Sequence, residues 1–153
     1  MDETVGTNQA PWHLWVVGIL GLLWNGFGGY DYYMSQTANE EYIAAMTEPF
    51  GFEAEVATEY FASFPLWADA AWALGVWGSI AGSVLLLLRS RFAFHAFVAS
   101  IIGLVVAMFY QFGNPIPGLT DSAMTMIFTA CIVILILLQT WYAKRMTVGG
   151  VLR

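Results

Sequence analysis

Four stretches of this chain are long, apolar and almost free of charged side chains. They cover residues 12–33, 66–88, 92–112 and 123–142. A bilayer core about 30 Å thick requires roughly 20 predominantly apolar residues in one helix. Because lipid offers no partners to backbone polar groups, each stretch has to be helical. The sequence therefore predicts an all-α membrane protein, a bundle of four transmembrane helices that forms a single domain over residues 1–153.

The composition excludes several other classes of protein. Hydrophobic residues make up 59% of the chain and charged residues 10%, against about 25% charged in soluble domains. The net charge of -6 and the lack of clustered Lys and Arg argue against a nucleic-acid partner. No nucleophile lies beside a base in the sequence, and neither a glycine-rich phosphate loop nor an HExxH motif is present. We expect the partner to be the lipid bilayer and expect no enzyme.

Small residues recur at helical spacing in the first two spans. Gly18, Gly21 and Asn25 share one face of the first span, and the second carries a track of Gly75, Gly78 and Gly82. Helices in lipid associate through small residues and interhelical hydrogen bonds. We interpret the glycines as helix-packing positions and Asn25 as a hydrogen-bonding group between helices. The same track could also join copies of the chain, so a homo-oligomer or a larger membrane complex is predicted.

The loop over residues 34–64 holds six of the eleven acidic residues. Its pattern predicts two short amphipathic helices that break near Pro49 and Gly51. Aromatic and apolar side chains recur every four residues in the second of them, at Phe52, Val56, Tyr60 and Phe64. Two placements fit this pattern: the segment caps the end of the bundle, or it lies on the membrane at the lipid headgroups.

The basic residues predict the orientation. With four spans, all five fall on the side of the membrane that also holds both termini: Arg89, Arg91, Lys144, Arg145 and Arg153. Lys and Arg in short loops face the cytoplasm. The sequence therefore predicts cytoplasmic N and C termini and places the acidic 34–64 segment outside.

Polar residues gather near the predicted outer end of the bundle. Ionisable groups inside a membrane are costly and suggest function. With aromatic walls from Trp24, Phe27, Trp72 and Tyr110, they would form a pocket for a neutral or cationic solute. The hypothetical solute site consists of Asn25, Asp31, Asp69, Trp72 and Gln111. Helix packing by Asn25, and a helix-dipole role for an acid in a first helical turn, as at Asp69, are the simpler alternatives.

The only two histidines, His13 and His95, fall at the predicted cytoplasmic ends of their helices. Two imidazoles from different helices can ligate a haem iron, so a haem b protein is an alternative. Interfacial histidines that bond water or headgroups are the simpler interpretation. No cluster of Cys, His or acidic residues suggests another metal. We expect no metal and no cofactor.

Two runs carry a resemblance to a group of membrane proteins: PWHLWVVGILGLLWNGFGGYDYYMSQTANEEYI and FPLWADAAWALGVWGSIAGSVLLLLRSRFA. They resemble small proteobacterial four-span inner-membrane proteins that begin P-x-H-L-W... L-W-N-x-x-G-x-x-D-Y. Members are labelled hypothetical or, in some cases, sugar transporter. The resemblance implies a bacterial inner membrane and supplies no site residues. Three functions stay open: small-solute, possibly sugar, transport or sensing; an accessory or assembly subunit of a larger membrane complex; and bis-histidine haem electron transfer.

Overall fold

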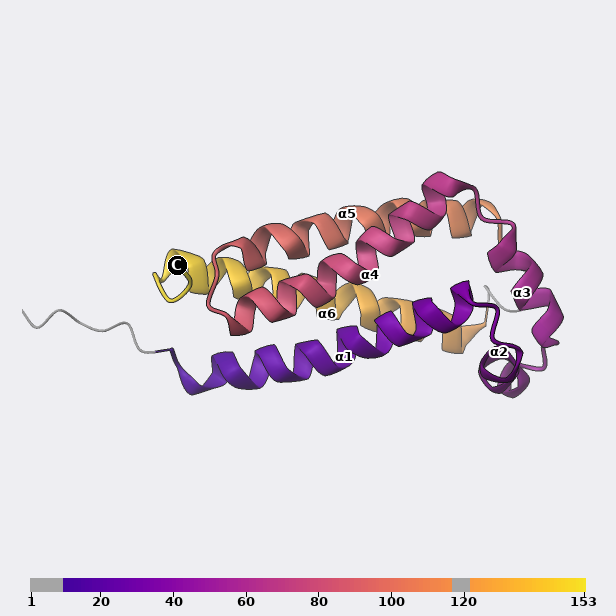
Figure 1. Cartoon of the computed structure of the whole chain (residues 1–153), viewed down its shortest axis with the longest axis horizontal. Helices are drawn as coiled ribbons and strands as arrows, with labels where there is room; N and C mark the ends of the chain where they lie inside the picture. Colours follow the sequence, from indigo (N-terminus) through magenta and orange to yellow (C-terminus); the bar gives the residue numbers. More distant parts are fainter. Residues whose placement is uncertain (1–9, 117–121) are drawn as a thin grey trace, which may run out of the picture.

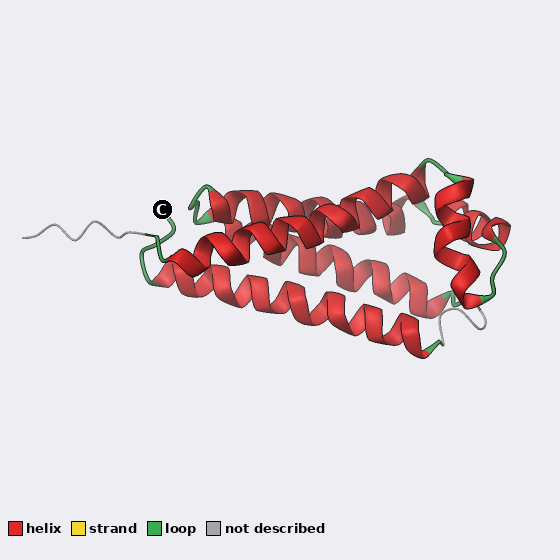
Figure 2. Cartoon of the chain, turned by 90° about the horizontal axis from the view of Figure 1, so that it is seen from below, coloured by secondary structure: helices red, strands yellow, loops and turns green. Residues whose placement is uncertain are grey.

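The computed structural model describes residues 10–116 and 122–153, and every regular element in these two ranges is a helix. The elements are α1 (Trp12–Gln36), α2 (Glu40–Thr47), the 3-10 turn η1 (Glu48–Phe50), α3 (Ala54–Ala62), α4 (Leu66–Leu87), α5 (Phe92–Gly113) and α6 (Ala123–Val148). The all-α prediction is therefore confirmed. The four long helices run side by side along the long axis of the molecule, while α2 and α3 lie together at one end (Figure 1; Figure 2). We name this the capped end.

Three of the described helices, α4, α5 and α6, are long and apolar enough to cross a membrane. α1 is as long, with 25 residues, but it is not among the three. Its polar positions and its many glycines lower its mean hydropathy. α4 and α5 end within one residue of the predicted spans, whereas α6 continues to Val148, beyond the predicted end at residue 142. The apolar run defined that prediction, but the helix continues through the charged residues that follow it.

The closest helix contact joins α4 to α5. A Cβ added at Gly103 would lie 2.4 Å from the backbone nitrogen of Gly75, so the two backbones touch here. A Cβ at Gly78 would meet the backbone of Ser100, and one at Gly82 would meet the Phe97 ring. The glycine track of α4 is therefore occupied by α5. The track thus packs within the chain, and the association of copies of the chain stays a prediction.

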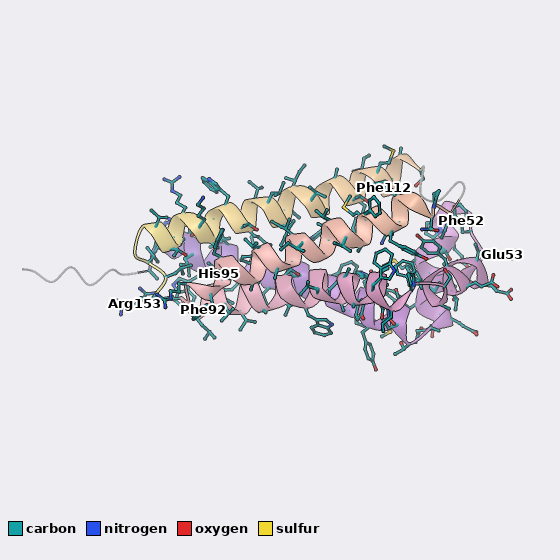
Figure 3. All side chains as sticks on the ribbon, turned by 90° about the horizontal axis from the view of Figure 1, so that it is seen from above. Phe52, Glu53, Phe92, His95, Phe112 and Arg153 are labelled. Carbon is teal, nitrogen blue, oxygen red and sulfur yellow. The ribbon has the colours of Figure 1, made fainter. Side chains whose placement is uncertain are left out.

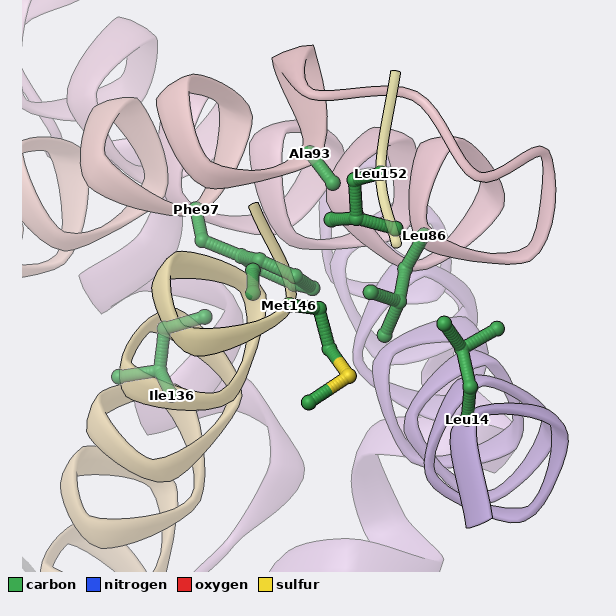
Figure 4. Packing of buried hydrophobic residues seen from close by; sticks show 8 residues of the cluster. Leu14, Leu86, Ala93, Phe97, Ile136, Met146 and Leu152 are labelled. Atoms are coloured by element: carbon green, nitrogen blue, oxygen red, sulfur yellow. The ribbon is translucent and has the colours of Figure 1, made fainter. Parts of the chain in front are cut away.

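The end opposite the capped end holds the apolar core. Leu14, Leu86, Phe97 and Leu152 are almost fully buried in one cluster (Figure 4). Leu152 reaches the cluster because the chain after α6 folds back along the α4–α5 turn. There the Arg153 N–H donates to the Arg89 carbonyl at 2.8 Å, and the Arg91 N–H donates to the Arg153 carbonyl at 2.9 Å. We name this the basic end, because all five basic residues of the chain lie there. Two are in the α4–α5 turn, two are near the end of α6, and one follows α6.

The short helices pack on the bundle at the capped end. Phe61 of α3 stacks on Trp72 of α4 with ring centroids 5.3 Å apart, and Phe64 meets Tyr110 of α5 at 4.8 Å. These contacts favour the cap over the headgroup placement. The predicted stripe was partly wrong, because Val56 is exposed while Ala57 is buried. The packed face is instead Ala57, Phe61 and Phe64, at helical spacing.

Candidate solute cavity

A cavity of about 180 Å³ lies between the four long helices in the half nearer the capped end. Each of the four helices contributes to its wall. The lining residues are Trp24, Asn25, Phe27, Gly28, Asp31, Trp72, Gly75, Val76, Ser79, Ser100, Leu104, Ala107, Met108, Gln111, Phe128, Thr129, Ile132 and Ile136. The wall is thus mostly apolar with a few polar groups, which is typical of ligand sites.

Asn25 forms the floor of the polar part and joins three helices. Its Nδ2 donates to Ser83 Oγ at 2.9 Å, to Gln139 Oε1 at 3.0 Å and to the Ser79 carbonyl at 3.2 Å. The backbone carbonyl of Ser79 can only accept a hydrogen bond, so the amide nitrogen of Asn25, and not its oxygen, has to face it. Asn25 Oδ1 accepts no hydrogen bond from the described residues. The group that Asn25 can offer to a ligand is therefore an acceptor.

Close approach at Gly21 makes this network possible. A Cβ at Gly21 would lie 3.0 Å from Gln139 Nε2 and 3.4 Å from Ser83 Oγ. On the same face of α1, a Cβ at Gly18 would meet the side chain of Leu87. The glycine face of α1 therefore contacts side chains of α4 and α6, which are polar at Gly21 and apolar at Gly18.

The two serines of the wall have already used their hydroxyl hydrogens. Ser79 Oγ donates to the Val76 carbonyl at 2.7 Å, and Ser100 Oγ donates to the Gly75 carbonyl across the α4–α5 contact. Serine hydroxyls in membrane helices commonly bond the preceding turn, as Ser79 does here. What each serine can still present to a ligand is a lone pair of its oxygen.

Asp31 is the one carboxylate among the lining residues, and no Lys, Arg or His lines the described cavity. The Tyr42 hydroxyl of α2 donates to Asp31 Oδ1 at 2.8 Å. Its second carboxylate oxygen has no hydrogen-bond partner among the described residues. Asp31 therefore connects the cavity to the cap and keeps one acceptor oxygen open.

The remaining polar groups of the wall are Gln111 and Thr129, whose side chains make no hydrogen bond to other described residues. They offer an amide and a hydroxyl as donors, and the indole N–H groups of Trp24 and Trp72 are donors as well. Four aromatic side chains complete the wall, and two of them, Trp24 and Phe128, approach each other with ring centroids 6.1 Å apart.

Of the five residues predicted for the solute site, the structure brings four to the cavity: Asn25, Asp31, Trp72 and Gln111. Asp69 does not line it, because it accepts hydrogen bonds from Gln36 Nε2 and Tyr32 OH at the junction of α1 and α4. Tyr110 was predicted to form part of the cavity wall. It packs instead against Phe64, which follows α3, and against Trp67 in the first turn of α4. The serines, Thr129 and Phe128 were missed, since such residues are ordinary in membrane helices.

The two histidines lie in separate surroundings at the basic end. His13 Nδ1 pairs with the Tyr142 hydroxyl, while His95 is exposed beside Phe92 and Phe94. Figure 3 shows His95 and Arg153 at the end opposite Glu53. Neither histidine lines the cavity. Within the described ranges, no three His, Cys, Asp or Glu side chains form a group that could hold a metal ion. The haem alternative therefore gains no support from the packing.

Comparison of the chain with protein-family models, with curated proteins and with solved structures gave no match in any of the three. A function for the chain has to follow from the chemistry of the cavity and from the membrane character of the helices.

Proposed function

We propose that the protein is a four-span membrane protein whose cavity binds a small polar solute, as a component of solute transport or sensing. α1 is the fourth span in this proposal. It lies beside the three apolar helices (Figure 1), and its large side chains Ile19, Leu20 and Leu23 are more than half exposed. Apolar side chains exposed along a bundle surface are expected where lipid covers them.

The proposed orientation has the basic end in the cytoplasm and the capped end outside. Short basic segments stay on the cytoplasmic side, and the resemblance of the sequence to proteobacterial inner-membrane proteins supports a bacterial plasma membrane. The cavity then lies in the outer half of the bundle, under the cap. A solute from outside would reach it past α2 and α3.

The cavity itself carries the proposal. Its volume of about 180 Å³ is below the ~300–1,000 Å³ of drug-sized sites. The solute is therefore small. The single carboxylate, the aromatic walls and the absence of basic lining residues in the described part favour a neutral or cationic one.

An accessory subunit of a larger membrane complex is the second candidate. Only 11% of the apolar window of α6 is buried, against 33% for α4 and 28% for α5. α6 thus has a wide apolar face that a partner helix could cover. Affinity purification from native membranes in mild detergent separates the candidates, because a stoichiometric larger partner would favour the subunit.

Two glycines of α1 provide a direct test of the cavity. A Cβ at Gly28 or at Gly26 meets nothing within 4 Å, but only Gly28 lines the cavity. Gly28→Leu should fill the cavity, and Gly26→Leu is the matched control. In a thermal-shift screen of small polar solutes, a hit should raise the Tm of the wild type and of Gly26→Leu but not of Gly28→Leu. Equal shifts in all three proteins would place binding elsewhere and refute the proposal.

A further inference from the structure

The one charged group left open in the described cavity wall is an acceptor, the carboxylate of Asp31. Asn25 has committed its Nδ2 to three partners, which leaves its Oδ1. Ser79 and Ser100 have donated their hydroxyl hydrogens to backbone carbonyls. Asp31 keeps one carboxylate oxygen open. The side chains with donors to offer are Gln111, Thr129 and the indoles of Trp24 and Trp72, and none of them carries a charge.

From this one carboxylate with no basic partner in the described wall, we infer that the solute is a small protonated amine, whose ammonium group donates hydrogen bonds to Asp31 and to Asn25 Oδ1. The inference rests on the proposed solute-binding function and narrows it to one class. An ammonium group has three donors and a charge opposite to that of the Asp31 carboxylate, which no neutral ligand provides. A hydrogen bond between ions is also stronger than one between neutral groups.

The aromatic walls fit the same class of ligand. Trp24, Trp72, Phe27 and Phe128 line the cavity with Asp31, and a cation near the face of an aromatic ring is stabilised, most strongly by tryptophan. No basic side chain lines the described cavity to repel a cation. An anion would instead face Asp31 with few donors to bind it.

The distribution of charge along the molecule also favours a cationic solute. The surface hollow between α2 and α3 is bordered by Glu40, Glu55 and Glu59, and these acids lie at the capped end, near the cavity. The basic residues lie at the other end. Surface charge of one sign raises the local concentration of ligands of the opposite sign. Cations are thus favoured at the end from which the cavity would be reached.

Three small probes separate an amine from other polar solutes. Ethanolamine carries ammonium donors, choline carries the same charge without N–H donors, and glycerol is neutral. Binding is measured by calorimetry on the full chain in mild detergent, in an amine-free buffer. We expect ethanolamine to bind about 10- to 100-fold more tightly than choline or glycerol, the range that a charged hydrogen bond provides.

Two carboxylates at the same end give a matched pair of variants. Asp31→Asn removes the charge in the cavity but keeps an oxygen for Tyr42, whereas Asp69→Asn removes a charge that does not line the cavity. Ethanolamine affinity should fall about 10-fold or more in Asp31→Asn and stay near the wild-type value in Asp69→Asn. An equal loss in both variants, or no loss in Asp31→Asn, overturns the inference.

The outcomes also separate this inference from the proposed function. If glycerol binds as tightly as ethanolamine and both are lost in Gly28→Leu, the amine class is wrong but the cavity remains the solute site. If no probe binds, the amine class is again wrong, and the wider solute screen decides on the cavity. If ethanolamine binds Gly28→Leu as well as the wild type, both proposals fail.

Discussion

The side-chain amide nitrogen of Asn25 lies 3.0 Å from Oε1 of Gln139, which joins the first and the last long helix across 114 residues of sequence. The same nitrogen reaches Ser83 of α4. Both partners are buried. A single side chain therefore ties three of the four long helices together directly beneath the cavity.

This contact predicts that Asn25 and Gln139 are coupled in stability. Asn25→Ala should lower the free energy of unfolding by about 1–2 kcal/mol, because it leaves buried acceptors without their donor. In a double-mutant cycle with Gln139→Ala, we expect a coupling of about 0.6 kcal/mol and at most about 1.7 kcal/mol, the values typical of membrane helices. Gln111→Ala is the control, since that amide bonds no described residue. Strictly additive Asn25 and Gln139 effects would contradict the contact.

The α4–α5 backbone contact predicts different effects for two glycines of α5. A Cβ at Gly103 would clash with backbone atoms of Gly75 and Ala71, whereas one at Gly113 meets nothing within 4 Å. Gly103→Ala should destabilise the bundle by about 1–3 kcal/mol, the range for overpacking, and Gly113→Ala should be nearly neutral. Unfolding titration in detergent measures both. A neutral Gly103→Ala would show that the helices are further apart than described.

The buried position of Leu152 predicts that the residues after α6 contribute to stability. Leu152 is 4% exposed in the core cluster, whereas Val148, four residues earlier, is 82% exposed. Leu152→Ala should cost about 2 kcal/mol or more, as for other buried leucines. Val148→Ala should cost less than about 0.5 kcal/mol, as for surface substitutions. Equal melting temperatures for the two variants would mean that Leu152 does not pack as described.

The hydrogen bond from Tyr42 of the cap to Asp31 of the bundle predicts that the stability of the fold falls at alkaline pH. Burial, and then the hydrogen bond that it donates to Asp31, raise the pKa of Tyr42 above its usual value. A raised pKa means that the fold favours the protonated phenol. Its contribution is complete below the usual tyrosine pKa of about 10 and is lost as the pH rises through the raised pKa. The absorbance titration of Tyr42→Phe is subtracted from that of the wild type, so that the difference reports on Tyr42. In this difference, tyrosinate absorbance should appear only above about pH 10. Ionisation at or below that pH would contradict the contact.

The long helices were predictable because each contains a long apolar run with very few charged side chains. Helix ends that lie outside the apolar runs were harder to predict. α6 continues past Trp141 through the basic residues, because charged side chains do not end a helix. The tail after Gly149 was not anticipated, because nothing local in the sequence indicates that Leu152 enters the core.

The polar part of the site was predictable only for residues whose chemistry is unusual in a membrane. Asn25, Asp31 and Gln111 are conspicuous there, and the structure brings all three to one cavity. Ser79 and Ser100 carry no such signal, because serine is common at helix contacts in lipid. The pairing of Gln139 with Asn25 was not predicted, because it depends on how α6 is rotated against α1, which the sequence does not specify.

The four-span arrangement with the cap outside is tested most directly by labelling single cysteines in intact cells. In a Cys131→Ser background, Glu48→Cys lies on the exposed surface of the cap, and Lys144→Cys is exposed at the basic end. A membrane-impermeant maleimide should label Glu48→Cys in intact cells and Lys144→Cys only after the membrane is permeabilised. Labelling of both positions from the outside, or of Lys144→Cys alone, would contradict the arrangement.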